Sequence, residues 1–317
     1  MNKKVQILRA LAIIAVVTIH TIPNNFIAIF IRPFTNFCVA MFIFLSGYLT
    51  NPHVEDIGRF YRKRLSRVLI PYIIWTCIYC IIYRSSVRVI LFSLLTSTVS
   101  YAFYYCFVYA QLVLITPWIG KNIEKKYSWI LALIQPVFIL IVQYLLNCLH
   151  RPIPSPWNAI FFCSWLTYYF MGLKMKSHSQ KADIKLYIIL ALSIILQIIE
   201  GMFWFYFENA DMATSQAKIS TMLTNIILMV IACGWLNNGK KLAGNLLQRI
   251  LETIGDCSFG IYLSHVLIIT LISNKMPIYN SLFPPVKTIC VFLISLISVL
   301  IGRRIVGKKF GRYLGLY

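Results

Sequence analysis

Long apolar runs recur along this 317-residue chain and constrain its fold more than any other feature. A helix that crosses a bilayer needs roughly 17–25 such residues, because it rises only about 1.5 Å per residue. In hydrocarbon the backbone must satisfy its own polar groups, so each long run predicts an α-helix. The runs lie at about 5–22, 30–49, 68–83, 102–119, 128–147, 157–173, 184–207, 217–236, 257–273 and 286–305. We therefore predict an all-α, polytopic integral membrane protein with about ten transmembrane helices.

The composition supports a membrane protein rather than a soluble one. Hydrophobic residues make up 59% of the chain and charged residues 12%, whereas a soluble globular chain carries about 25% charged residues. Residues 87–100 are apolar but too short to span, so we expect an interfacial or re-entrant piece there. No linker divides the sequence, and residues 1–317 are predicted to form a single transmembrane domain.

The formal net charge of +21 follows a topological pattern. If the N-terminus is cytoplasmic, 23 of the 30 Lys and Arg residues fall in cytoplasmic segments. The seven on the outer side are Arg32, Arg84, Arg88, Arg151, Lys218, Lys275 and Lys287. This positive-inside bias predicts that both termini are cytoplasmic. The basic charge then reflects topology and contact with anionic membrane lipids, and we expect no nucleic-acid partner.

Two polar residues, Arg9 and His20, interrupt the first apolar run. Eleven steps of about 100° bring the two side chains to the same face of a helix, roughly 16 Å apart along its axis. An ionisable residue inside a membrane helix is costly and marks a functional site by default. Arg9 and His20 are therefore candidates for two points on one pathway through the membrane.

A second group of polar residues precedes the third apolar run. Arg59, Arg62, Lys63, Arg64 and Arg67 lead directly into it. Arg64 and Arg67 are at i and i+3, so they point to one side of a helix. Planar guanidinium groups suit a polyphosphate ligand at the cytoplasmic mouth. The alternative is a topology determinant that binds lipid head groups.

Other polar residues in the apolar runs are weaker candidates. Ser46 and Tyr48 flank Gly47, a pattern that is also typical of close helix packing. Glu200 either orients a pocket residue or lies near the outer interface, and His265 is either a pocket residue or a hydrogen-bonded structural histidine. The nine cysteines and five histidines show no ligand spacing, so no metal site is expected.

Taken together, these motifs resemble the acyltransferase-3 family of bacterial membrane acyltransferases. The matching segments follow one another along most of the chain. They are Leu8-Arg9-Ala10-Leu11-Ala12 with His20, Phe44-Leu45-Ser46-Gly47-Tyr48, Tyr61 to Arg67 with Ile70-Pro71-Tyr72, Phe103-Tyr104 with Leu112 to Pro117, and Ser258 to His265. The sequence departs from the family where Gln6 or Ile7 replaces an acidic residue before the first arginine.

The resemblance implies transfer of an acyl group, usually acetyl, from cytoplasmic acyl-CoA to a hydroxyl of a cell-surface glycan such as O-antigen, in the bacterial inner membrane. His20 would be the general base or a transient acyl carrier, and Arg9 would bind phosphate or orient the thioester. Acetyl-CoA would be the donor substrate, with no permanently bound cofactor, and a glycan or lipid-linked glycan the acceptor. Acyl-CoA phosphates would bind Arg64, Arg67 and Arg62, and the possible pocket residues are Ser46, Tyr48, Tyr72, Glu200 and His265.

Two other classes of protein compete with an enzyme. A transporter of polysaccharide or lipid-linked sugar would use Arg9 and His20 as ligands or as a proton relay, without consuming acetyl-CoA. A structural subunit of an export complex would tolerate His20→Ala.

Overall fold

Every regular element in the described residues is a helix. The computed structural model describes residues 2–154, 157–176, 183–239 and 242–317. Eight helices in this part of the chain are long and apolar enough to cross a membrane. They are Lys3–Thr21, Phe26–Tyr48, Ile57–Ile82, Lys126–Cys148, Ile184–Tyr206, Ala210–Asn237, Leu246–Lys275 and Pro284–Gly311. The predicted all-α, multi-pass membrane fold is confirmed.

The other two predicted spans contain shorter or less apolar helices. α6 (Tyr104–Asn122) covers the run at 102–119, and α9 (Leu166–Met175) covers only the second half of the run at 157–173. Gln111 of α6 binds the backbone before α9, donating to the Ile160 carbonyl at 2.8 Å and accepting from the Phe162 N–H at 3.1 Å. Non-helical backbone is tolerated at membrane depth where protein groups satisfy it in this way. The number of crossings stays a prediction.

Two predicted segments are helical in the structure, with bounds that differ from the apolar runs. α4 (Ile57–Ile82) begins well before the apolar run at 68–83, because the Asp56 carboxylate caps it by accepting from the Arg59 N–H at 2.8 Å. The basic segment is therefore the first part of a helix. α5 (Val87–Thr96) forms a short apolar helix in the segment predicted to be interfacial or re-entrant.

The breaks in two of the membrane helices contact each other. α2 (Phe26–Ile31) is followed by the 3-10 turn η1 (Arg32–Phe34) and then by α3 (Cys38–Tyr48). α11 (Ala210–Thr214) is separated from α12 (Ile219–Asn237) by four residues. The buried Asn36 amide donates to the carbonyls of Thr214 and Ser215, at 3.3 and 3.1 Å. The break between α2 and α3 thus helps to satisfy the polar backbone of the break between α11 and α12.

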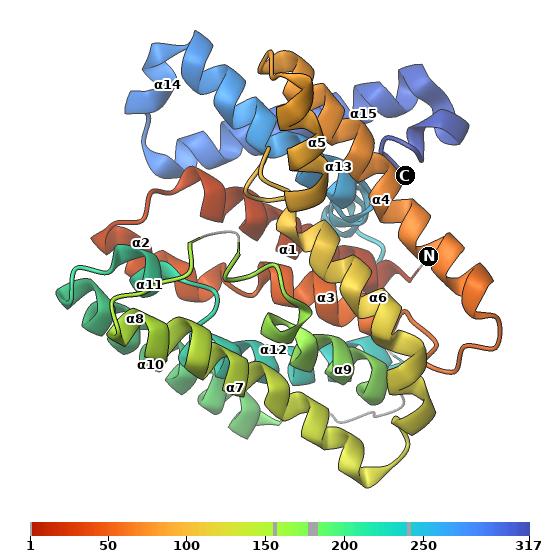
Figure 1. The fold of residues 1–317 in the computed structure, drawn as a ribbon, viewed down its shortest axis with the longest axis vertical. Helices are drawn as coiled ribbons and strands as arrows, with labels where there is room; N and C mark the ends of the chain where they lie inside the picture. The colour runs from red at the N-terminus through yellow and green to blue at the C-terminus, as the bar shows by residue number, and fades with distance from the viewer. Residues whose placement is uncertain (1, 155–156, 177–182, 240–241) are drawn as a thin grey trace.

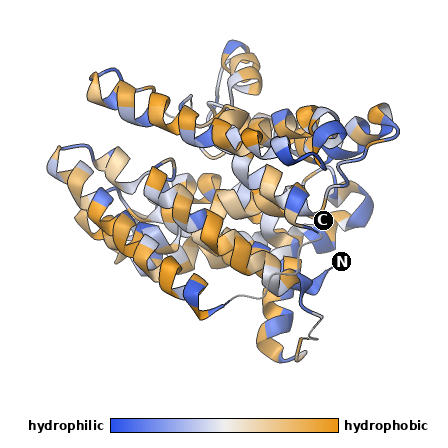
Figure 2. Ribbon diagram, turned by 90° about the horizontal axis from the view of Figure 1, so that it is seen from below, coloured by the Kyte–Doolittle hydropathy of each residue, from blue (hydrophilic) through white to orange (hydrophobic). Residues whose placement is uncertain are grey.

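The helices run between two chemically different ends of the molecule. Both termini lie at one end, together with the α3–α4 connection that begins the basic segment (Figure 1). Hydrophilic residues gather at the same end in a second view (Figure 2). We name it the basic end, and the opposite end, where α2, α11 and α14 (Pro277–Ser281) lie, the far end. Residues 177–182 and 240–241, which carry part of the predicted cytoplasmic charge, lie outside the described residues.

Helices α1 (Lys3–Thr21) and α13 (Leu246–Lys275) form the centre of the core, and they approach closely at a glycine. A Cβ atom on Gly255 would lie 2.0 Å from the Gln6 carbonyl oxygen. The remaining elements surround this pair. They are η2 (Lys126–Leu133), α7 (Ile134–Ile139), η3 (Leu140–Leu145), α8 (Leu146–Cys148), η4 (Phe162–Ser164), α10 (Ile184–Tyr206) and α15 (Pro284–Gly311).

Candidate active site

His20 lies in the last turn of α1, toward the far end, and contacts two other rings. Its ring centroid is 5.2 Å from that of His265 on α13 and 4.9 Å from that of Tyr101, just before α6. His20 is half-buried and His265 fully buried. The close packing of α1 on α13 therefore brings together two imidazoles from opposite parts of the sequence.

The hydrogen bonds of His265 indicate its neutral tautomer. Nδ1 lies 2.7 Å from the Tyr262 carbonyl oxygen and 3.2 Å from that of Ile261. A carbonyl oxygen only accepts, so Nδ1 carries the hydrogen and Nε2 carries the lone pair. Nε2 is buried, and the described residues offer it no hydrogen-bond partner. A buried acceptor of this kind is available to a substrate group beside His20.

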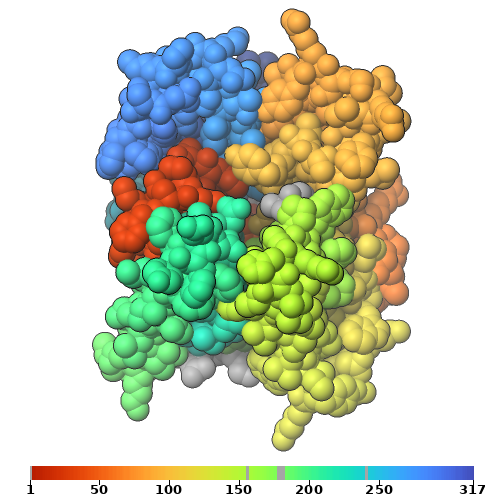
Figure 3. All heavy atoms as spheres, turned by 60° about the vertical axis from the view of Figure 1, so that its left-hand side comes forward, coloured from red at the N-terminus to blue at the C-terminus, as the bar shows by residue number. Residues whose placement is uncertain are grey.

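Tyr101 is the third ring of the cluster formed with His20 and His265. The residue is 46% exposed, and its ring contacts that of His20. A tyrosine hydroxyl is protonated and can donate at neutral pH, and partial burial raises the pKa of Tyr101 further, to about 12. Figure 3 shows the far end of the molecule, where the red N-terminal helices, the gold segment around α5 and the yellow-green residues near α8 meet around the centre.

Arg9 lies on the same face of α1, closer to the basic end. Its guanidinium is half-buried and interacts electrostatically with Tyr105 and Tyr109 of α6 and with Asp256 of α13. His20 likewise contacts α13 and the residue that precedes α6. Both polar side chains of α1 thus face the same two neighbours, as the helical periodicity predicts.

A row of aromatic rings joins the two positions. Tyr105 is 6.3 Å from Tyr109 and 5.5 Å from Tyr262, and Tyr262 is 6.2 Å from His265, measured between ring centroids. These residues recur every four positions along α6 and every three along α13, so each set lies on one face of its helix. The row gives an apolar lining to the region between Arg9 and His20.

The predicted phosphate-binding arginines lie near the start of α4. Arg64 is half-buried and donates from Nη2 to the Leu49 carbonyl at the end of α3, at 2.9 Å. Arg62 and Arg67 are exposed. The structure therefore places the Arg64 guanidinium against α3, whereas the side chains of Arg62 and Arg67 lie on the molecular surface.

Four other predicted pocket residues occupy separate positions. The Ser46 hydroxyl is buried and has no hydrogen-bond partner among the described residues. Tyr48 donates to the side chain of Asn237 at 2.6 Å, and Tyr72 donates to the Ser93 carbonyl at 2.8 Å. Glu200 accepts from the Ser220 N–H at 3.3 Å and from the Tyr144 hydroxyl. Glu200 therefore neutralises the amino end of α12, a favourable position for a carboxylate.

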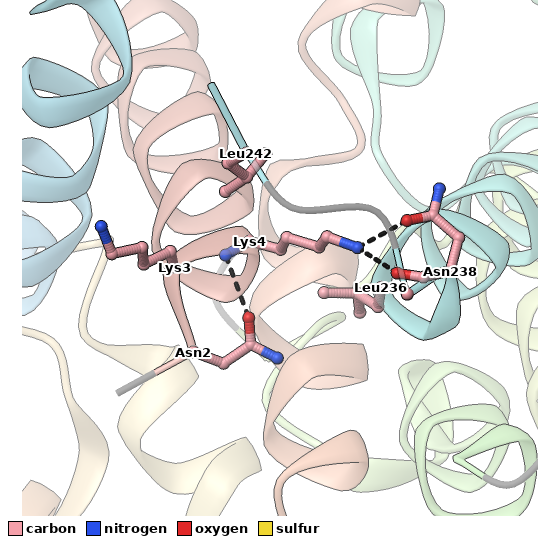
Figure 4. A pocket seen from close by; sticks show the side chains of 7 residues that line it. Asn2, Lys3, Lys4, Leu236, Asn238 and Leu242 are labelled. Carbon is pink, nitrogen blue, oxygen red and sulfur yellow. Dashed lines mark hydrogen bonds between the residues drawn. The ribbon is translucent and has the colours of Figure 1, made fainter. Parts of the chain in front are cut away.

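A pocket of about 470 Å³ opens at the basic end, beside the start of α1. Lys4 extends across it toward α12 and binds the backbone and side-chain oxygens of Asn238, at 2.5 and 2.6 Å (Figure 4). It also donates to the Trp235 carbonyl at 2.9 Å. These bonds cap the carboxyl end of α12 with a cation. These bonds therefore hold the start of α1 against α12. All three N–H donors of the Lys4 ammonium group are used in them.

The sequence reasoning missed the aromatic row and treated Arg32 only as one of seven outer basic residues. Arg32 is 9% exposed and lies in the break between α2 and α3. A charge inside a predicted membrane run is a signal that could have singled it out. In the described residues no group of three or more His, Cys, Asp or Glu could hold a metal ion.

The comparisons with known proteins give one match. A profile of the acyltransferase-3 family, described as an acyltransferase domain, matches residues 2–304. No curated protein matches the sequence significantly, and no solved structure does.

Proposed function

Because the chain belongs to the acyltransferase-3 family and is a membrane acyltransferase, we propose that it moves an acetyl group from acetyl-CoA to a glycan hydroxyl. The donor binds at the basic end, which faces the cytoplasm, and the acceptor enters from the far end. The acceptor is a cell-surface glycan such as O-antigen, presented as a polymer or as a lipid-linked unit. The protein acts in the bacterial inner membrane.

The observation that carries this proposal is the juxtaposition of His20 with His265. The His20 imidazole lies beside a buried Nε2 that has no hydrogen-bond partner in the described part of the chain, an arrangement that supports proton transfer in a region of low polarity. His20 removes the proton from the acceptor hydroxyl while the hydroxyl oxygen attacks the thioester carbonyl carbon. The C–S bond then breaks, and coenzyme A leaves as the thiol after taking up the proton. An acetyl-His20 intermediate would divide the same net reaction into two steps.

The donor half of the proposal rests on the arginines. Arg64 and Arg67 sit on one side of α4, and with Arg62 they offer planar donors for the phosphates of coenzyme A. The acyl-pantetheine arm then extends along the aromatic row toward His20. Arg9, at the end of that row nearer the basic end, orients the thioester or binds phosphate. Tyr101 is a donor near the developing oxyanion.

The test is acetyl transfer by cells that lack the gene, carry it, or carry His20→Ala. Base-labile O-acetyl groups on the surface polysaccharide are measured by NMR. We expect His20→Ala to lower transfer by at least ~100-fold, the scale of general acid–base catalysis. His53→Ala is the matched control, because that histidine is 61% exposed in its side chain and lies near the start of α4.

Two outcomes would contradict the proposal. Full transfer by a well-expressed His20→Ala protein would remove His20 from the chemistry. Unchanged acetylation in all strains, with expression verified, would point to another acceptor or to transport without covalent chemistry. Consumption of radiolabelled acetyl-CoA by the purified protein separates those two readings.

A further inference from the structure

Arg32 is a buried cation whose donors are only partly used. Its Nη2 donates to the Asn24 side-chain oxygen at 2.6 Å, and its Nε has no hydrogen-bond partner among the described residues. Within that part of the chain no carboxylate forms an ion pair with it. The carboxylate of Asp211 connects to Arg32 only through Asn24, whose amide donates to it at 3.0 Å. A buried guanidinium with unfilled donors is costly and calls for an anionic partner.

The surroundings of Arg32 add to its positive potential. Its charge acts on Cys38, the first residue of α3, and on His20. Among the described residues, Phe37, the N-cap residue of the 11-residue helix α3, makes no side-chain cap bond. A helix amino end without such a cap carries partial positive charge. The guanidinium and this helix end therefore favour the same kind of ligand, close to the candidate catalytic imidazole.

We infer that Arg32 binds an anionic oxygen group of the acceptor and thereby holds its hydroxyl near His20. This inference rests on the proposed acetyl transfer. The anionic group is a phosphate that links the sugar to its carrier, or the carboxylate of an acidic sugar. Guanidinium binds either group with parallel, charge-assisted hydrogen bonds, whereas a neutral glycan offers it no such partner. The protein is thus selective for acidic or phosphate-bearing acceptors.

Anion binding is tested first without any acyl transfer. The purified protein in lipid nanodiscs is heated with inorganic diphosphate, with glucuronate or with chloride at equal ionic strength. We expect diphosphate or glucuronate to raise the Tm of the wild type and of Arg88→Gln, an exposed arginine, but not that of Arg32→Gln. The anion that raises the Tm more shows whether Arg32 prefers a phosphate or a sugar carboxylate. Equal Tm shifts in Arg32→Gln and the wild type, or no shift in either, overturn the inference.

Acceptor selectivity is then measured with a neutral glycoside, a glycosyl phosphodiester and a uronic acid glycoside. Loss of one charge-assisted interaction costs ~1.5–3 kcal/mol, so Arg32→Gln should lower the anionic-to-neutral ratio of kcat/KM by ~10–100-fold. Arg32→Lys should keep part of that ratio, and Arg88→Gln should keep all of it. An equal loss for charged and neutral acceptors overturns the inference. If the wild type transfers no acetyl group to any acceptor, the proposed function fails, while the Tm measurement still decides anion binding.

Discussion

At the scale of single residues, the polar side chains inside the apolar helices divide into two groups. Some are satisfied by the protein, such as Glu200 at the amino end of α12 and Tyr72 against the backbone of α5. Others have atoms that no described residue hydrogen-bonds, such as His265 Nε2 and Arg32 Nε. Because an unsatisfied polar atom is expensive in a dry interior, the second group is where substrate binding is expected.

Arg64 provides a test of donor binding at this scale. We expect Arg64→Ala to raise the apparent KM for acetyl-CoA by ~10–100-fold, because it removes a charge-assisted contact to phosphate. Steady-state transfer at varied acetyl-CoA concentration measures this effect. Arg304→Ala, an exposed arginine near the C-terminus, is the control. An unchanged KM in Arg64→Ala would favour the topological role of the basic segment.

At the scale of elements, close helix contacts decide where the functional side chains lie. The backbones of α3 and α9 are in contact where the two helices cross. A Cβ on Gly47 would lie 2.3 Å from the Tyr169 carbonyl oxygen. On the other helix, a Cβ on Gly172 would lie 2.2 Å from the Phe44 carbonyl oxygen. Small residues permit this approach in membranes, where van der Waals packing drives helix association.

The crossing predicts a sharp contrast between two glycines. Gly172→Ala should destabilise the protein by ~1–3 kcal/mol, because the backbones must separate to admit the methyl group. Gly58→Ala should be neutral or slightly stabilising, since its Cβ would meet only the Asp56 carboxylate at 3.6 Å. Thermal unfolding of both variants in the same detergent measures the difference. Equal stability of the two would contradict the contact between α3 and α9.

At the scale of the whole molecule, charge separates the two ends. The termini share the basic end, and α2, which Arg32 follows directly, lies at the far end (Figures 1 and 2). This asymmetry supports the proposed reaction, in which the donor and the acceptor would arrive from opposite sides of the membrane. It also predicts the orientation of the chain through the positive-inside rule.

Reporter fusions test that orientation. A fluorescent protein fused to either terminus should fluoresce, because both termini are predicted to be cytoplasmic. Alkaline phosphatase fused after Ser281, at the end of α14, should be active, because that helix lies at the far end. Opposite locations for the two termini would require an odd number of crossings and would overturn the predicted topology.

The sequence by itself determined the all-α membrane fold and the common face of Arg9 and His20, because both depend on local properties: the length of apolar runs and the period of one helix. Ser46, Tyr48 and Glu200 were recognisable as polar residues in apolar runs, but their hydrogen bonds were not. Only the tertiary structure set His265 beside His20 and left Arg32 without an ionic partner among the residues that the structure describes. Those relations depend on how helices distant in the sequence pack, and the pattern of one helix does not specify its register against another.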